Sequence, residues 1–280
     1  MFANWVQRFV KQSIRASGRR TRRAVGRMVL MESRTLLSAS IGASPKINNP
    51  FPSQSGARGA QNVPLFPLAD TFKLHSRPNA SKVIYLDFNG QSVTGTAWNS
   101  NGNTLVFNAY SDEGDASFTN NELETVQRIW ARVVEDFAPF DVDVTTEEPP
   151  LADLMNTGGG DTRWGVRTII SSNDPLNSGA GGIAYIGSFS WDSDTPALVF
   201  NGGEKAAAET VSHEVGHALG VVHDGRTSPS EEYYSGHGTG ETSWGPIMGA
   251  SFSPKLTQWS RGEYTSASNQ EDDLSIMTTG

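Results

Sequence analysis

A periodic pattern of apolar residues predicts a long amphipathic helix near the middle of the chain. Residues 119–122, Thr-Asn-Asn-Glu, form a capping box, in which the Thr and Glu side chains satisfy backbone N–H groups at the start of a helix. After this box, apolar residues recur at steps of three and four, the spacing of one helix face. They are Leu123, Val126, Trp130, Val133, Val134 and Phe137. We therefore expect residues 119–137 to form a helix with one buried face.

Shorter apolar runs predict strands. Residues 82–88 are rich in β-branched and aromatic side chains, which is typical of a buried strand. The pair Asn101-Gly102 predicts a tight turn, with residues 96–98 and 105–107 as the two arms of a hairpin. The other expected strands are residues 141–146, 166–171, 182–187 and 197–200.

A second long helix is expected over residues 204–219, where three consecutive alanines favour helix formation. After Gly220 the chain is rich in loop-forming residues until a final helix that follows Asn269. This order of elements predicts an α/β (α+β) fold. It has a twisted, mostly parallel sheet with one antiparallel edge strand, the helix of 204–219, and a small loop-rich C-terminal subdomain.

Charge separates the N-terminal end of the chain from the rest. Residues 1–34 hold nine Lys and Arg against one acid, whereas the other 246 residues hold 13 Lys and Arg against 29 Asp and Glu. We expect a basic, export- or targeting-like segment over 1–37, a linker or short pro-segment over 38–79, and a folded domain over 80–280. Apolar residues between 65 and 74 would allow part of the linker to lie across a cleft of that domain.

The composition limits the partners of the chain. The acidic domain lacks the basic surface that nucleic-acid binding requires, so we expect no nucleic acid. There is no run of 18 or more apolar residues, so we expect no transmembrane segment. The chain has no Cys, which excludes disulfides and thiolate zinc sites. We expect a monomer.

One short stretch carries the candidate chemistry. His213 and His217 are four residues apart, so on a helix both imidazoles project from the same face. Glu214 is the candidate general base, because it lies beside the first ligand and can polarise a metal-bound water. Gly220 allows a left-handed turn that ends the helix, so that His223 can approach as a third ligand. Three imidazoles with an open fourth position are typical of one catalytic zinc ion, Zn²⁺.

This stretch resembles the pattern H-E-x-x-H-x-x-G-x-x-H of the metzincin metallopeptidases. Pro246-Ile247-Met248-Gly249 resembles the Met-turn that these enzymes carry beneath the zinc. Asp224, directly after the third His, is similar to the reprolysin and snapalysin-like branches. Residues 182–187, Gly-Ile-Ala-Tyr-Ile-Gly, are similar to the substrate-binding edge strand of reprolysins. Over about residues 70–280 the chain resembles bacterial secreted metzincins.

The resemblance implies that residues 80–280 are the catalytic domain of a secreted zinc endopeptidase. A zinc-bound water would attack the peptide carbonyl, and Glu214 would accept its proton. Met248 would form an apolar floor under the imidazoles, and Asp224 would support the C-terminal subdomain through hydrogen bonds. An extended protein or peptide substrate would pair antiparallel with the edge strand. The residues implied for this pairing are Gly182, Ile183, Ala184, Tyr185 and Ile186.

Two other functions are compatible with the same motif. The chain could be a surface or matrix protein that binds peptides without cutting them, or an amidase that acts on cell-wall peptides. The intact Glu214 favours an enzyme over a binding protein, because binding alone does not require a base. Tyr233, Tyr234 and His237 lie between the third ligand and the Met-turn, and any of them could line the pocket.

Three further interpretations stay open. The acidic residues at 112–115 and 271–273, with Asp87, offer oxygen ligands for Ca²⁺, although neither cluster has the spacing of a twelve-residue calcium loop. Residues 31–38 resemble a Leu-Glu-Pro-Arg-x-Leu-Leu tract of planctomycete surface proteins, which implies a secreted or cell-surface location. A disordered basic tail explains the same residues. His75 is the one linker residue able to reach a zinc ion, and a surface histidine is the alternative.

Overall fold

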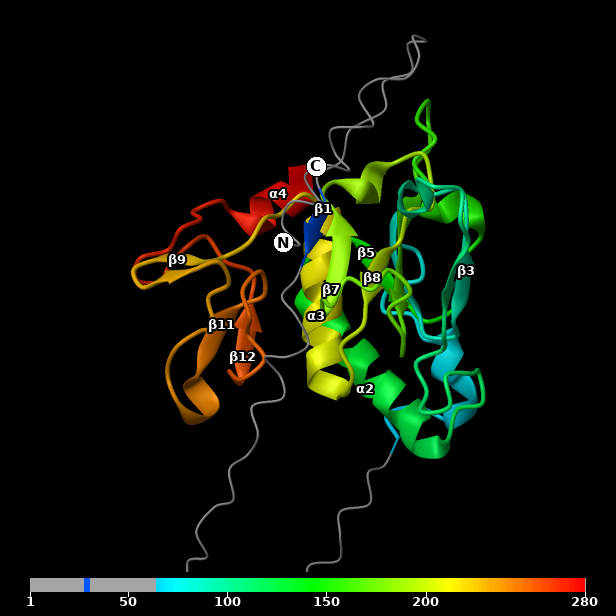
Figure 1. Ribbon diagram of the computed structural model, residues 1–280, viewed down its shortest axis with the longest axis horizontal. Helices are drawn as coiled ribbons and strands as arrows, with labels where there is room; N and C mark the ends of the chain where they lie inside the picture. The colour runs from blue at the N-terminus through cyan, green and yellow to red at the C-terminus, as the bar shows by residue number, and fades with distance from the viewer. Residues whose placement is uncertain (1–27, 31–63, 280) are drawn as a thin grey trace, which may run out of the picture.

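A mostly parallel sheet forms the centre of the structure (Figure 1). The computed structural model describes residues 28–30 and 64–279. Within this part, four strands run parallel in the order β8 (Ala197–Val199), β6 (Trp164–Ile170), β2 (Lys82–Asp87) and β5 (Val142–Thr145). A fifth strand, β7 (Gly182–Tyr185), pairs antiparallel with β8. The expected α/β fold with one antiparallel edge strand is confirmed.

Residues from far upstream add another strand outside β7. This strand, β1 (Met28–Leu30), pairs antiparallel with β7, and Figure 1 shows the two side by side. The rest of the predicted N-terminal segment 1–37 lies outside the described residues, and so do the linker residues 38–63 and the whole tract at 31–38.

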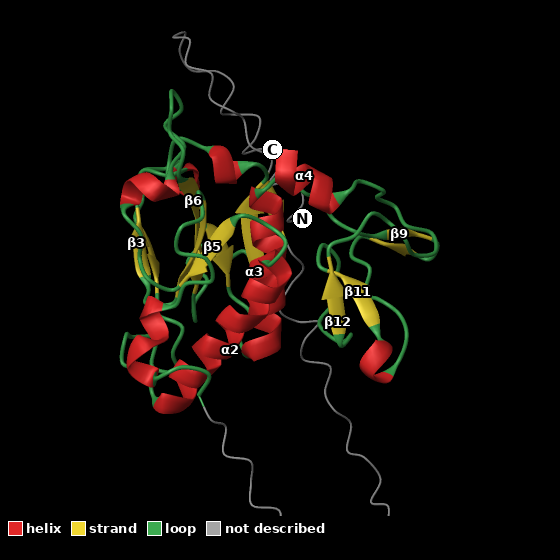
Figure 2. Cartoon of the chain, turned by 180° about the vertical axis from the view of Figure 1, so that it is seen from behind, coloured by secondary structure: helices red, strands yellow, loops and turns green. Residues whose placement is uncertain are grey.

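Two long helices cover one face of the sheet (Figure 2). The first, α2 (Asn120–Phe137), begins at the predicted capping box, where Glu122 Oε2 accepts a hydrogen bond of 2.7 Å from Thr119 N. The second, α3 (Glu204–Ala218), packs against α2 and against β6, β7 and β8. The apolar side chains between helices and sheet form the main core. They include Ile84, Leu86, Val126, Ile129, Val133, Phe137, Val166, Val211 and Val215.

The predicted hairpin around residues 96–107 is wrong. Residues 97–99 form a short 3-10 helix, capped by Thr96 Oγ1, which accepts a hydrogen bond from Trp98 N. Because Thr96 caps this helical turn, residues 96–98 do not form a strand. Instead, β4 (Leu105–Phe107) pairs with β3 (Gln91–Val93), which lies earlier in the chain.

Residues 64–79 pack on α2 and β5, at the opposite edge of the sheet from β7. Phe66 N donates a hydrogen bond of 2.9 Å to Gln127 Oε1 on α2, and Leu74 is buried in the main core. His75 Nδ1 lies 2.7 Å from Asp143 Oδ2 on β5. These contacts place the apolar residues between 65 and 74 on α2 and β5 and not across a cleft, and they engage His75 away from the candidate metal ligands. The domain boundary at residue 80 stays a prediction.

The chain after α3 forms a small loop-rich part, as expected, and Figure 1 shows it across α3 from the sheet. Here β9 (Arg226–Thr227) pairs with β10 (Ser230–Glu231), β11 (Trp244–Pro246) runs parallel to β12 (Leu256–Gln258), and α4 (Asp273–Thr279) follows. Short 3-10 helices lie at Leu68–Lys73, Ala97–Asn99, Leu151–Leu154, Ser188–Ser190 and Gly240–Thr242. No helix in the described part combines the length and apolar character needed to span a bilayer.

Candidate metal centre

The end of α3 brings three histidines to one place. His213 and His217 lie on the helix and are fully buried. Gly220 has a φ of +106°, which L side chains rarely adopt. Its N–H donates to His217 O at 2.9 Å, and Val221 N donates to Gly216 O at 3.0 Å, the bond pattern that closes a helix with a left-handed residue. The chain therefore turns back at the predicted glycine and leads directly to His223.

The three imidazoles converge. One nitrogen atom from each of His213, His217 and His223 lies within 4.8 Å of the other two. Within residues 28–30 and 64–279, no other group of three His, Cys, Asp or Glu lies close enough together to hold a metal ion. The sequence motif thus places its three candidate ligands as a metal site requires.

Hydrogen bonds from the protein set the orientation of two imidazoles. His213 Nδ1 lies 2.9 Å from Ile247 O, and His217 Nδ1 lies 2.9 Å from Val221 O. A carbonyl oxygen only accepts, so each Nδ1 must carry a proton and donate it. Burial also lowers the pKa of His213 well below its usual value and that of His217 to about 4. Both rings are therefore neutral near pH 7, with a lone pair on Nε2.

The spacing of the imidazole nitrogens fits a bound cation. His217 Nε2 lies 3.0 Å from His223 Nε2. Two nitrogens that each bind one tetrahedral zinc at 2.0–2.1 Å would be about 3.3 Å apart. Among the described residues, the buried His213 Nε2 has no hydrogen-bond partner. A lone pair that is buried without a donor is costly, and a cation between the three rings would remove that cost.

Glu214 lies beside the first ligand in the interior of the protein. The residue is fully buried, and within the described part of the chain neither carboxylate oxygen has a hydrogen-bond partner. Burial raises the pKa of this carboxyl well above its usual value. A nearby metal charge would oppose that rise. The environment is one in which Glu214 can hold a proton as well as release it.

Met248 packs against α3, the helix that carries His213 and His217. It is fully buried, and a Cβ added at Gly216 would lie 2.6 Å from Met248 Sδ and 3.0 Å from the ring of Trp259. The glycine inside the motif therefore lets the thioether and the indole approach the backbone of α3. Ile247 and Val221 complete this small apolar cluster.

Asp224 connects the third ligand to the C-terminal part. Its backbone N donates to Met248 O at 2.9 Å, and its backbone O accepts from Tyr234 N at 2.7 Å. Tyr264 Oη lies 3.5 Å from Asp224 Oδ1 and donates to Gly225 O at 2.8 Å. Burial, with the charge of Glu271, raises the pKa of Asp224 to about 7. The residue sits where the predicted supporting role requires, although the role itself stays a prediction.

The strand β7, which is predicted to bind substrate, lies along α3. Gly187 N donates to His217 O at 2.9 Å, which ties the end of β7 to α3. At the other end of the strand, a Cβ added at Gly182 would lie 2.6 Å from Glu214 Oε1. Ile183 and Ala184 are buried within β7, Tyr185 is partly exposed, and Ile186 follows the strand. Substrate binding by these residues stays a prediction.

Tyr233 is the aromatic residue nearest the histidines among those named from the sequence. Its ring centroid lies 4.3 Å from that of His223 and 6.3 Å from that of His213. Tyr234 turns away, because its hydroxyl pairs with His237 Nδ1 at 2.9 Å and its ring stacks on Tyr264. The positions of Tyr233, Tyr234 and His237 in the sequence follow no spacing rule that indicates which of them lies nearest the histidines.

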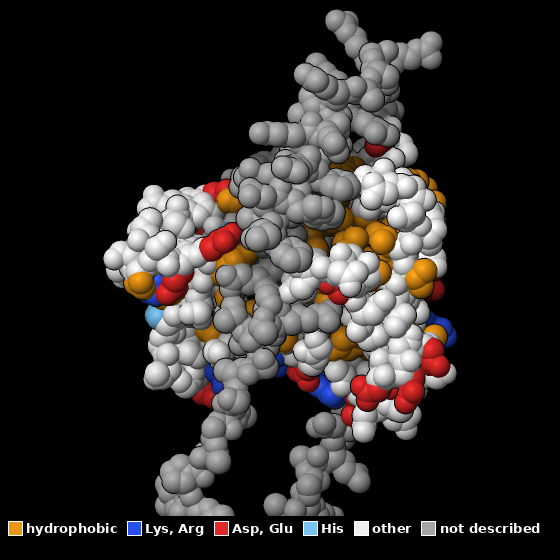
Figure 3. Space-filling model, in the orientation of Figure 1, with side chains coloured by type: hydrophobic (Ala, Val, Ile, Leu, Met, Phe, Trp, Pro, Cys, Tyr) orange, Lys and Arg blue, Asp and Glu red, His pale blue; other side chains and the backbone are white. Residues whose placement is uncertain are grey.

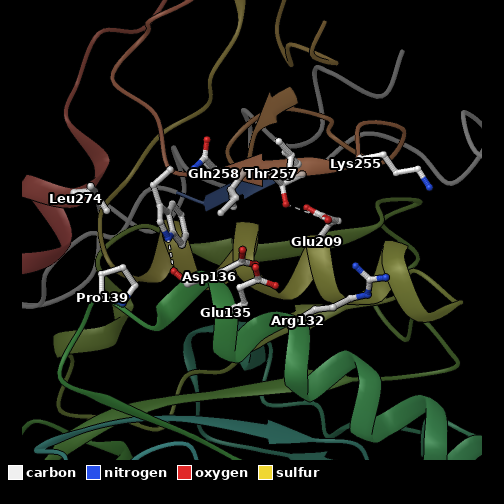
Figure 4. A pocket seen from close by; sticks show the side chains of 12 residues that line it. Arg132, Glu135, Asp136, Pro139, Glu209, Lys255, Thr257, Gln258 and Leu274 are labelled. Carbon is white, nitrogen blue, oxygen red and sulfur yellow. Dashed lines mark hydrogen bonds between the residues drawn. The ribbon is translucent and has the colours of Figure 1, made fainter. Parts of the chain in front are cut away.

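A separate cavity of about 380 Å³ lies between α2, α3 and β12 (Figure 4). Two acids of its lining have raised pKa values, because burial raises that of Glu209 to about 7 and that of Asp136 to about 6. Neither the three histidines nor Glu214 lines this cavity. It is distinct from the candidate metal centre.

The structure gives no support to a calcium site. Asp87 Oδ2 accepts a hydrogen bond of 3.0 Å from the buried Arg167, which also pairs with Asp194. Neither of the acidic clusters at 112–115 and 271–273 forms a group of three converging ligands in the described residues. The acids at 112–115 lie in a solvated loop, and those at 271–273 lie at the start of α4, where acidic side chains are favoured.

Comparison with known families agrees with this geometry. A family model described as metallo-peptidase family M12, of the reprolysin type, matches residues 166–260, which extend from β6 to just beyond β12 and contain all three histidines. No curated protein matches the chain. Residues 166–260 are therefore similar to metallopeptidases of family M12, which are of the metzincin type, and the three converging histidines within them fit the zinc-binding motif of such enzymes.

Proposed function

We propose that the protein is a zinc endopeptidase in which Glu214 is the general base. The observation that carries this proposal is the convergence of three imidazoles beside a buried carboxyl group that has no hydrogen-bond partner among the described residues. Three histidines and no fourth protein ligand among the described residues match a catalytic zinc site, whereas structural zinc has four protein ligands. A zinc ion held there supplies Lewis acidity, which polarises a carbonyl oxygen and makes water more acidic.

Glu214 is suited to move a proton in both directions. One oxygen of the carboxylate would accept the proton of the attacking water and would later donate it to the leaving amine. Burial raises the proton affinity of this group, which favours both acceptance of the proton and its retention until the amine departs. Because the group makes no hydrogen bond to the described residues, no competing donor lowers its basicity.

The substrate would be an extended segment of a protein or peptide. The backbone of β7 runs along α3 past Glu214, so a strand paired with β7 would carry its peptide bonds past the carboxyl group. The main-chain groups of β7 would then hold the substrate, and cleavage within a chain follows naturally from this mode of binding. A secreted location, with residues 80–280 as the catalytic domain and residues 1–37 as an export segment, completes the proposal.

The decisive experiment compares the full chain with Glu214→Gln. Gln has nearly the same size and cannot accept the proton, so the variant should bind one zinc per chain as the parent does. Cleavage of fluorescein-labelled denatured casein should fall by about 10²–10⁴-fold. Equal cleavage by both proteins would exclude Glu214 as the base. Absence of cleavage by the zinc-loaded parent would instead favour a peptide-binding function.

A further inference from the structure

The outer side of β7 is occupied by residues of the same chain. In the antiparallel pairing, Met28 lies opposite Tyr185, Val29 opposite Ala184 and Leu30 opposite Ile183. The other side of β7 pairs with β8. A strand has two edges, and each edge pairs with one strand at a time. A peptide that adds to β7 must therefore take the position that β1 holds.

The direction of β1 is that of the expected substrate. Because β1 is antiparallel to β7, it runs from the Tyr185 end of that strand toward the Gly182 end. Gly182 is the residue whose backbone abuts the Glu214 carboxyl. The segment thus approaches the base along the same edge and with the same polarity that an extended peptide substrate would use.

Charge favours this self-association. Residues 1–34 carry nine Lys and Arg against one acid, whereas residues 64–279 carry 11 Lys and Arg against 29 Asp and Glu. Figure 3 shows apolar side chains gathered beside the grey atoms near the middle of the face, and acidic side chains, with some Lys and Arg among them, mainly at its lower right. A segment with a net positive charge is attracted to a folded part with a net negative charge. Because it is tethered, it also acts at an effective concentration on the order of mM.

We infer that Met28–Leu30 is an intramolecular competitor for the peptide-binding edge of β7. This inference rests on the proposed function, which gives that edge its substrate. If β1 is paired in about nine chains of ten, a substrate binds only the remaining tenth, and its apparent affinity falls about tenfold. Displacement of β1 is then a condition for full activity.

A binding experiment tests the inference without any catalysis. In the full-length Glu214→Gln background, Val29→Pro removes a backbone donor from β1 and Val29→Ile keeps it. The probe is a labelled peptide with the sequence of residues 25–34, followed by fluorescence anisotropy. It should bind the Val29→Pro protein about tenfold more tightly than the Val29→Ile protein. A scrambled peptide should bind neither. Equal affinities for both proteins, or equal binding of the scrambled peptide, would overturn the inference.

An activity experiment gives a second, separable result. With Glu214 intact, Val29→Pro should raise kcat/KM for labelled denatured casein about tenfold over the parent, mainly through KM, whereas Val29→Ile should match the parent. Met28→Pro serves as the second variant if Val29→Pro folds poorly. Unchanged KM at equal zinc content would overturn the competition. If no protein cleaves casein but the anisotropy result holds, β1 still competes for the edge of β7, and the proposed peptidase activity is wrong.

Discussion

At Gly182 the backbone of β7 lies directly against the carboxyl group of the proposed base. A Cβ at this position would meet Glu214 Oε1 and Thr210 Cγ2, each at 2.6 Å. We expect Gly182→Ala to displace the carboxyl and to lower kcat/KM by about 10²-fold, since a shift on the order of 1 Å in a catalytic group has that effect. Steady-state kinetics on proteins of equal zinc content would measure it.

Gly202→Ala is the matched control for this substitution. A Cβ at Gly202 would meet no atom within 4 Å, so activity should not change. If both alanine variants keep full activity, Gly182 does not set the position of Glu214, and the close approach of strand and base has no catalytic role.

His75 makes the attachment of residues 64–79 sensitive to pH. Burial lowers the pKa of His75, but the hydrogen bonds and charges of Glu147 and Asp143 outweigh burial, and the net shift is upward. A group whose pKa is raised by folding stabilises the fold below its unfolded pKa, and this contribution disappears as the pH rises through the folded pKa. Relative to His75→Gln, the parent should be more stable at about pH 5 than at about pH 9.

Urea unfolding at the two pH values measures this difference. Because His75 is partly exposed, solvent screens the ion pairs and the effect should be small. A stability difference between parent and His75→Gln that is the same at both pH values would show that the protonated form of His75 is not favoured in the folded chain.

The metal ligands could be predicted from the sequence because their geometry is local. The four-residue spacing of His213 and His217 and the left-handed Gly220 determine where the imidazoles point, whatever the rest of the fold does. The position of Tyr233 beside His223 could not be predicted, because it depends on the path of a loop between distant elements. The same is true of Trp259, which reaches α3 from β12.

At the level of the secondary-structure elements, α2 is stabilised by its capping box. Thr119 Oγ1 accepts from Glu122 N at 3.3 Å, and Glu122 Oε2 accepts from Thr119 N at 2.7 Å. Thr119→Ala should lower the free energy of unfolding by about 1 kcal/mol. Thr125→Ala is the control on the same helix, because its hydroxyl donates to Asn121 O and accepts from Arg128 Nη2 without taking part in the cap, and Ala has the higher helix propensity.

Urea denaturation of the two Thr variants measures the contribution of the cap. We expect Thr119→Ala to be destabilised and Thr125→Ala to be unchanged or slightly stabilised. Equal destabilisation of both variants would mean that the loss of any threonine on α2, rather than the loss of the cap, weakens the helix.

Elements defined by their own residues were predictable, and elements defined by pairing were less so. The helices α2 and α3 follow from periodicity and from residues at their ends. The hairpin at Asn101-Gly102 failed because the Thr96 side chain binds the backbone locally and converts one arm into a 3-10 helix. The pairing of β1 with β7 joins residues more than 150 positions apart, and no local pattern encodes such a partner.

In the whole molecule, the candidate metal centre joins two parts of the fold. His213 and His217 belong to the helix that packs on the sheet, whereas His223 begins the loop-rich C-terminal part. A bound zinc ion would link these parts, so its removal should destabilise the chain as well as inactivate it. We expect a chelator to lower the urea midpoint, and one equivalent of zinc to restore it. An unchanged midpoint would show that the three histidines hold no ion in the folded protein.

Restoring activity to the metal-free chain would show whether the three histidines and Glu214 form a zinc peptidase site. The full-length protein is stripped with a chelator, dialysed, and assayed on labelled denatured casein as zinc is added. We expect no cleavage without metal and full cleavage at one zinc per chain, and we expect His223→Ala not to recover activity. Cleavage by the metal-free chain, or recovery by His223→Ala equal to that of the parent, would contradict this expectation.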